Sequence, residues 1–179
     1  SLGADRPGEV VLVATDRAGA GIIERARQGG IAAVTMDREQ RTSGMLALLT
    51  RHGVDLIVLA GYLRMVPSEV TRSFRGRIVN IHPALLPAFG GPGMYGHHVH
   101  EAVVARGARI SGATVHFVDE GMDTGAILAQ VSIPIGPRDT AGTLTEKLSE
   151  LGGSLVVDTL SRIESGGLTA VPQDNGKAS

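Results

Sequence analysis

Apolar residues recur along this chain in short continuous runs, separated by glycine, proline and polar residues. A continuous apolar run is typical of a strand buried on both faces. Such runs predict strands at residues 10–14, 31–36, 56–60, 78–81, 113–118 and 127–135. Helical spacing between the runs predicts helices at residues 20–29, 41–52, 67–74, 97–106 and 143–164. This alternation predicts an α/β fold, with a doubly wound, mostly parallel sheet and helices on both faces.

The composition is that of an ordinary globular domain. The 179 residues are 42% hydrophobic and 20% charged, and we expect a single domain over residues 1–170 with a polar tail over residues 171–179. A formal net charge of -1 gives no electrostatic reason to expect nucleic acid or an anionic membrane as a partner. No apolar run approaches membrane-spanning length. The absence of cysteine excludes disulfides and thiolate chemistry and suits a cytoplasmic location.

Ligands of a doubly wound sheet bind beyond the carboxyl ends of its strands. Asn80 and His82 end one predicted strand and, being two positions apart, face the same side. The Asn80 amide can stabilise a developing oxyanion, and a histidine with a pKa of about 6.5 can move protons near neutral pH. The alternative is that Asn80 caps a turn and His82 is a hydrogen-bonded core histidine. The pattern alone favours neither interpretation.

A second candidate is the loop at residues 119–125, Asp-Glu-Gly-Met-Asp-Thr-Gly, between two predicted strands. Its glycines allow a close approach to a ligand, and one of its carboxylates could hold the His82 ring and favour the imidazolium. The alternatives are a solvated acidic turn and a weak calcium loop. The spacing of the acidic residues does not fit a twelve-residue EF-hand loop.

Three segments together resemble the folate-dependent formyltransferases. They are Asn-Ile-His-Pro-Ala-Leu-Leu-Pro at residues 80–87, the run from Ser111 to Gly125, and Val-Leu-Ala-Gly-Tyr-Leu-Arg-Met at residues 58–65. The resemblance extends from about residue 10 to about residue 148. It is close to the branch of the family that acts on glycinamide ribonucleotide.

The resemblance implies a reaction and a catalytic centre. The family transfers a formyl group from 10-formyltetrahydrofolate, used as co-substrate, to the amine of glycinamide ribonucleotide in purine biosynthesis. Asn80, His82 and Asp123 fall on the family's catalytic positions. Asn80 and protonated His82 would stabilise the oxyanion, and Asp123 would orient His82. The resemblance implies no metal and no covalent enzyme intermediate.

The resemblance also implies binding residues. The residues expected to form the folate pocket are Arg64, Met65, Val66, Leu85, Asp119, Glu120, Gly121 and Met122. On the side of the second substrate we expect Ile81, Pro83 and Glu150. We expect these two small molecules as partners, with no nucleic acid and no membrane, and a monomer or a homodimer.

Two departures from the family pattern are visible. Family members begin with a further strand, a loop that holds the substrate phosphate at a helix N-terminus, and that helix. Residues 1–3 would match only the end of that helix, so we expect a gap in the sheet or an exposed edge beside residues 10–15, and weak or absent activity. In the final helix, Gly152 and Gly153 occupy the positions of a ribose-contacting Glu-His pair. Glu150 could compensate only after a register shift.

Other functions remain open on the sequence alone. The first is a formyltetrahydrofolate hydrolase, the second a sugar-nucleotide or initiator-tRNA formyltransferase, and the third a folate-binding remnant without catalysis. The histidines at positions 97, 98 and 100 invite a metal site, but adjacent histidines on a helix face apart. His116 lies in an apolar run and is expected to be a core histidine.

Overall fold

The computed structural model describes residues 8–174, and its strands and helices alternate up to α4, as predicted. The strands are β1 (Leu12–Thr15), β2 (Ala32–Thr35), β3 (Ile57–Ala60), β4 (Ile78–His82), β5 (Ile110–Phe117) and β6 (Ile127–Pro134). The helices are α1 (Gly21–Gln28), α2 (Met45–Arg51), α3 (Ser68–Ser73), α4 (His97–Ala105) and α5 (Ala141–Glu164). The α/β class is confirmed. None of the described helices is both long and apolar enough to cross a membrane.

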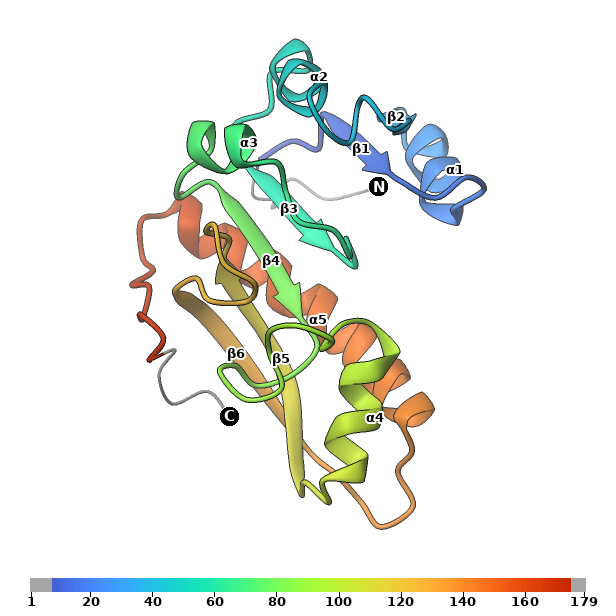
Figure 1. Cartoon of the computed structure of the whole chain (residues 1–179), viewed down its shortest axis with the longest axis vertical. Helices are drawn as coiled ribbons and strands as arrows, with labels where there is room; N and C mark the ends of the chain where they lie inside the picture. The colour runs from blue at the N-terminus through green and yellow to red at the C-terminus, as the bar shows by residue number, and fades with distance from the viewer. Residues whose placement is uncertain (1–7, 175–179) are drawn as a thin grey trace.

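The strands form two sheets (Figure 1). β1 pairs with β2 in parallel, and the larger sheet has the order β3-β4-β5-β6. In the larger sheet β3 and β4 are parallel, whereas β4/β5 and β5/β6 are antiparallel. The C-terminal half is therefore mixed rather than parallel. No crossover helix separates β5 from β6, and a short connection brings the second strand back in the opposite direction.

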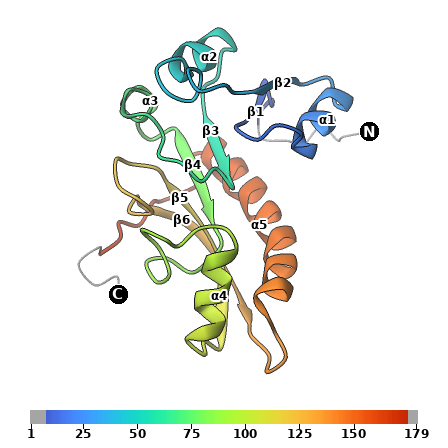
Figure 2. The same ribbon diagram turned by 45° about the vertical axis from the view of Figure 1, so that its right-hand side comes forward.

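Among the described strands, β1 and β3 do not pair with each other or with a common neighbour, so the expected gap beside β1 is present. The β1–β2 unit, with α1 and α2, lies at one end of the larger sheet (Figures 1 and 2). An apolar cluster that includes Met36, Leu48, Val70 and Phe74 joins the two parts. The expected match of residues 1–3 to a family helix lies outside the described residues.

Helices cover both faces of the larger sheet, as predicted. Ile78 packs in the cluster with Val70 and Phe74 of the α3 region, whereas its neighbour Val79 packs in a cluster with Leu155 of α5. Successive side chains of a strand point to opposite faces, so α3 and α5 lie on opposite sides of β4. Figure 2 shows α5 running along one face of the sheet.

Three element boundaries differ from the prediction for local reasons. α2 begins at Met45 rather than at residue 41, because the backbones and side chains of Asp37 and Gln40 hydrogen-bond reciprocally and form a turn first. α5 begins earlier than predicted, since Thr140 and Thr143 form a capping box. β5 also begins earlier than predicted, because Gly112 interrupts the apolar run from which the strand was predicted. A glycine is needed at this position, since a Cβ there would meet the Val131 carbonyl.

The first residues after residue 170 pack against the domain. Val171 and Ile127 exchange two backbone hydrogen bonds of 2.8 Å, so the chain pairs with the first residue of β6. Gln173 is half-buried against the loop that precedes β6. Val171 and Gln173 therefore contact the domain, although they lie beyond the predicted boundary at residue 170. The remainder of the expected tail, residues 175–179, lies outside the described part of the chain.

Candidate active site

A cleft of about 600 Å³ opens over the carboxyl end of β4. It is lined by residues 58–66, residues 80–83, the start of α4, the end of β5 with the loop after it, and one side of α5. Several of its apolar side chains are exposed, among them Leu63, Met65, Tyr95 and Met122. A cleft with apolar walls and a few polar groups suits a small organic ligand.

Asn80, His82 and Asp123 lie together in this cleft, as the sequence predicted. Asn80 and His82 leave the same face of β4 and reach one cluster of polar side chains. Nδ1 of His82 is 3.6 Å from Oδ2 of Asp123, which is within reach of a hydrogen bond after a small movement or through one water. The predicted convergence is confirmed, and the catalytic roles remain predictions.

Asp123 reaches the cluster because of an unusual backbone. Its φ is 57°, in the left-handed region that residues with a Cβ rarely adopt. Its carboxylate accepts a hydrogen bond of 3.1 Å from the Gly91 amide and lies 3.7 Å from Nε2 of His116. The loop thus places one carboxylate against both His82 and His116.

His82 is 3% exposed, and the carbonyl of Phe89 lies 2.8 Å from its Nε2. Because a carbonyl only accepts, Nε2 carries the proton. Burial lowers the pKa of His82 below its ordinary value of 6.5, although Asp123 and the Phe89 contact act in the opposite direction. His82 is therefore a neutral ring at neutral pH, with its unprotonated Nδ1 directed toward Asp123.

His116 is a site residue that the sequence analysis assigned to the core. It is 2% exposed, and its Nδ1 lies 2.8 Å from the Phe117 carbonyl, so Nδ1 is the donor. Nε2 then accepts from Nδ2 of Asn80 at 3.1 Å. Burial lowers the pKa of His116, which keeps Nε2 free to accept. The missing signal was strand pairing, because His116 is the cross-strand partner of Asn80 in the β4/β5 ladder.

The acidic loop has an internal structure of its own. Oδ1 of Asp119 accepts from the Gly121 amide at 3.0 Å and from the Thr124 hydroxyl at 2.6 Å. Asp119, Gly121 and Met122 line the cleft, whereas Glu120 is exposed and does not line it. Oδ1 of Asp119 therefore helps to hold the shape of the loop.

The other expected folate-pocket residues divide into two groups. Arg64, Met65 and Val66 line the cleft, and Nε of Arg64 also forms an ion pair of 2.8 Å with Asp16, which follows β1. Leu85 does not line it. The Leu85 side chain packs on Gly112 of β5, where it would lie 2.6 Å from an added Cβ.

The α5 wall of the cleft has no side chain at two positions. Gly152 and Gly153 line it together with Ser149, opposite Ile81 and Pro83 of the β4 end. A Cβ on Gly152 would lie 2.6 Å from Cδ1 of Ile81, so any larger residue there would require the end of the Ile81 side chain to move. The structure does not place Glu150 in the cleft, because its side chain is exposed on the other side of α5.

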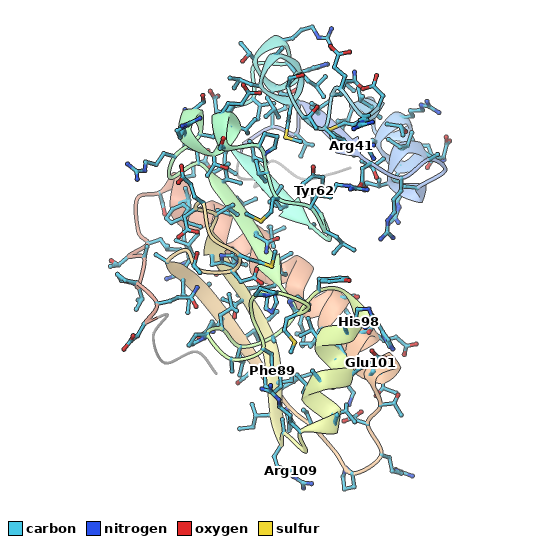
Figure 3. All side chains as sticks on the ribbon, viewed as in Figure 1. Arg41, Tyr62, Phe89, His98, Glu101 and Arg109 are labelled. Atoms are coloured by element: carbon cyan, nitrogen blue, oxygen red, sulfur yellow. The ribbon has the colours of Figure 1, made fainter. Side chains whose placement is uncertain are left out.

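The histidine tract does not converge. His97 and His98 are exposed and both contact Glu101, and Figure 3 shows His98 and Glu101 on the outer side of α4. His100 is instead buried and lines the cleft. Among residues 8–174 no group of three or more His, Cys, Asp or Glu side chains is arranged to hold a metal ion.

In this apolar cleft, an asparagine and a histidine from the end of a strand meet a carboxylate from a loop. The chain is therefore an α/β protein with a polar centre suited to proton transfer. The formyl transferase family model matches residues 3–160, and the chain belongs to that family. The match covers the β4 end, the loop with Asp123 and most of α5.

Several known proteins similar to this chain are phosphoribosylglycinamide formyltransferases. The chloroplastic enzyme of Arabidopsis thaliana is 42% identical over 163 residues, which cover 87% of this chain and 56% of that protein. The Bacillus subtilis enzyme is 36% identical over 146 residues, covering 78% and 72%. The crystal structure of glycinamide ribonucleotide transformylase 1 from Symbiobacterium toebii matches with a TM-score of 0.84 at 33% identity, covering 94% of this chain and 82% of that one. The chain thus spans about half the length of the plant relatives it matches.

Proposed function

We propose that this chain transfers a formyl group from 10-formyltetrahydrofolate to the amine of glycinamide ribonucleotide, a step of purine biosynthesis. The observation that carries the proposal is the convergence of Asn80, His82 and Asp123 in one apolar cleft. The names of these relatives support a formyl transfer to glycinamide ribonucleotide. No observation of the site favours the hydrolase, the tRNA or sugar-nucleotide transferases, or a binding protein without catalysis.

In the proposed reaction the free amine attacks the formyl carbon and a new C–N bond forms. The carbonyl oxygen becomes an oxyanion, and the bond from the formyl carbon to N10 of the folate then breaks. One proton leaves the attacking amine, and one proton is added to N10, so the charges balance. The residues of the cleft have to stabilise the oxyanion and move this proton.

Asn80 suits the first task. One of its two amide hydrogens is directed to Nε2 of His116, which fixes the plane of the amide. The second hydrogen is then held in a defined direction and can be donated to the oxyanion. A donor that is fixed before the reaction stabilises developing charge without reorganisation.

His82 and Asp123 suit the second task. Protonation of His82 gives an Nδ1–H that can close the 3.6 Å separation from the Asp123 carboxylate. Asp123 raises the pKa of His82 against the effect of burial, so it favours the imidazolium form. For contact with the reacting oxygen, the Nε2–H of His82 has to leave the Phe89 carbonyl.

The two substrates are assigned to opposite sides of this centre. The apolar side chains of Met65, Val66 and Met122 suit the flat pterin ring, and the wall formed by Ile81, Pro83 and α5 remains for the ribonucleotide. The proposed proton path uses side chains of the chain and requires no metal ligand. A cytoplasmic location and a monomeric or homodimeric state stay predictions from the sequence.

Product analysis tests the proposal. The purified chain is incubated with 10-formyltetrahydrofolate, with and without glycinamide ribonucleotide, and the products are identified by mass spectrometry. We expect formylglycinamide ribonucleotide and tetrahydrofolate only when both substrates are present. Release of formate at the same rate without the ribonucleotide would mean a hydrolase, and no turnover despite folate binding would mean a binding protein.

A further inference from the structure

Gln173 contacts the backbone of the loop that carries Asp123. Its Nε2 lies 2.8 Å from the carbonyl oxygen of Asp123 and 2.6 Å from that of Gly125. An amide nitrogen has two hydrogens, and here both are donated to the same loop. A residue 50 positions away along the chain thus joins the two carbonyls that flank Thr124.

Gln173 is held in place by its own segment. Two residues earlier, Val171 pairs with Ile127 of β6 through two backbone hydrogen bonds of 2.8 Å. Pro172 follows, and its ring restricts the backbone between the paired residue and Gln173. The Gln173 side chain is therefore anchored to β6, which is also the strand that the loop enters.

The orientation of the Gln173 amide is fixed by its partners. Carbonyl oxygens only accept hydrogen bonds. The NH2 group of Gln173 must therefore face the two loop carbonyls, and its Oε1 must point away from them. Oε1 of Gln173 is buried and has no hydrogen-bond partner among residues 8–174.

The loop needs such a restraint because its conformation is strained. Asp123 is one of two residues other than glycine with a positive φ among the described residues, and such a conformation costs on the order of 1–3 kcal/mol. At Gly125 an added Cβ would overlap the carbonyl of Phe117, so the loop returns very close to β5. An Asp123 released from this conformation would no longer direct its carboxylate to His82, His116 and the Gly91 amide.

We propose that Gln173 is a positioning residue for the catalytic centre, which holds the Asp123 loop in the conformation that sets the carboxylate against His82. The proposal rests on the proposed function only for its effect on turnover. Its structural part, the placement of Asp123, can be measured without any substrate.

The test uses the full chain with Gln173→Met, which keeps the length of the side chain and removes both donors. Gln173→Leu is the second variant, and is used if the first does not unfold cooperatively. The control is Gln28→Met, because Gln28 is exposed on α1 and donates to Glu24 on the same helix. NMR titration of the His82 ring, thermal unfolding and steady-state kinetics of formyl transfer are measured on each.

We expect the pKa of His82 to fall in the Gln173 variants, because Asp123 is the charged group that raises it, while His116 and His100 are the other titratable groups near the ring. We expect kcat to fall about tenfold or more with little change in the KM for folate, since displaced catalytic groups cost up to about 10²-fold.

The Gln28 variant should match the unmodified chain in all three measurements. An unchanged His82 pKa in the folded Gln173 variants would overturn the proposal. An unmodified chain without transferase activity would overturn the proposed function and leave the NMR test intact.

Discussion

Asn80 and His116 face each other across the β4/β5 ladder, with the amide nitrogen of the first 3.1 Å from Nε2 of the second. The contact depends on the tautomer that the Phe117 carbonyl imposes on His116. Because Nε2 of His116 accepts a hydrogen bond, the NH2 group of Asn80 must face it, and the position of the Asn80 carbonyl oxygen is then fixed as well. A side chain buried in the core therefore fixes the orientation of the Asn80 amide.

Replacement of His116 should lower kcat, because it disturbs the orientation of the Asn80 amide. We expect His116→Phe to lower kcat about tenfold, because the Asn80 amide loses its fixed orientation. Asn80→Ala should lower kcat further, and the double variant should be no worse than Asn80→Ala alone. His98→Phe is the control, since His98 is exposed on α4. Additive effects of the two substitutions would mean that His116 does not act through Asn80.

His82→Ala should reduce formyl transfer about a hundred-fold or more, the usual scale for a group that moves a proton in the reaction. The affinity for a folate analogue, measured by calorimetry, should change little, because His82 lies at the base of the cleft and not among the apolar side chains assigned to the pterin ring. His98→Ala serves as the matched control. Full turnover in the His82 variant would move the chemistry to another residue.

Stability should fall as the pH is lowered below about 6.5. Burial lowers the pKa of both His82 and His116, so the unfolded chain takes up protons that the native chain does not. The free energy of unfolding then decreases as pH falls through this range, by up to about 1.4 kcal/mol per pH unit for each histidine. Urea unfolding at pH 7.5 and 5.5 measures the effect. The loss should be smaller in His82→Ala, and equal losses would exclude His82 as a source.

The two adjacent glycines of α5 should respond in opposite ways to alanine. A Cβ on Gly153 meets nothing within 4 Å, so Gly153→Ala should stabilise by about 0.5–1 kcal/mol through helix propensity. A Cβ on Gly152 would meet Ile81 at 2.6 Å, and we expect Gly152→Ala to destabilise by about 1–3 kcal/mol through overpacking. Thermal unfolding of the two variants checks both. Equal shifts would mean that α5 moves freely away from β4.

The sequence predicted the elements well where the apolar runs were continuous, as in β3 and β4. It predicted the convergence of His82 and Asp123, but the rule about strand ends was only part of the reason. β5 runs antiparallel to β4, and Val118 bonds to Ile78 at the amino end of β4. The loop reaches His82 by folding back, with a positive φ at Asp123. Neither the strand direction nor this backbone conformation is encoded in the spacing of apolar residues.

Residues that act through pairing were not predictable from a local pattern. His116 required the β4/β5 register, and Gln173 required the return of the C-terminal segment to β6. Glu150 was assigned to the substrate side by its distance from Gly152 along the sequence, but residues two positions apart on a helix point about 200° apart. The family resemblance predicted which residues are catalytic. The contacts that orient those residues join positions far apart in the sequence, so a local pattern does not reveal them.

The separation of β1 from β3 has a consequence for how the molecule opens. Among residues 8–174 the β1–β2 unit has no ladder hydrogen bonds to the larger sheet, and it is connected to that sheet by an apolar cluster and the Asp16–Arg64 ion pair. Such a unit can unfold by itself at a lower free energy than the whole chain. We expect native-state hydrogen exchange to show the amides of β1 and β2 exchanging faster than those of β4 and β5. The part that carries the catalytic centre would then stay folded while its neighbour opens and closes, as a separate cooperative unit.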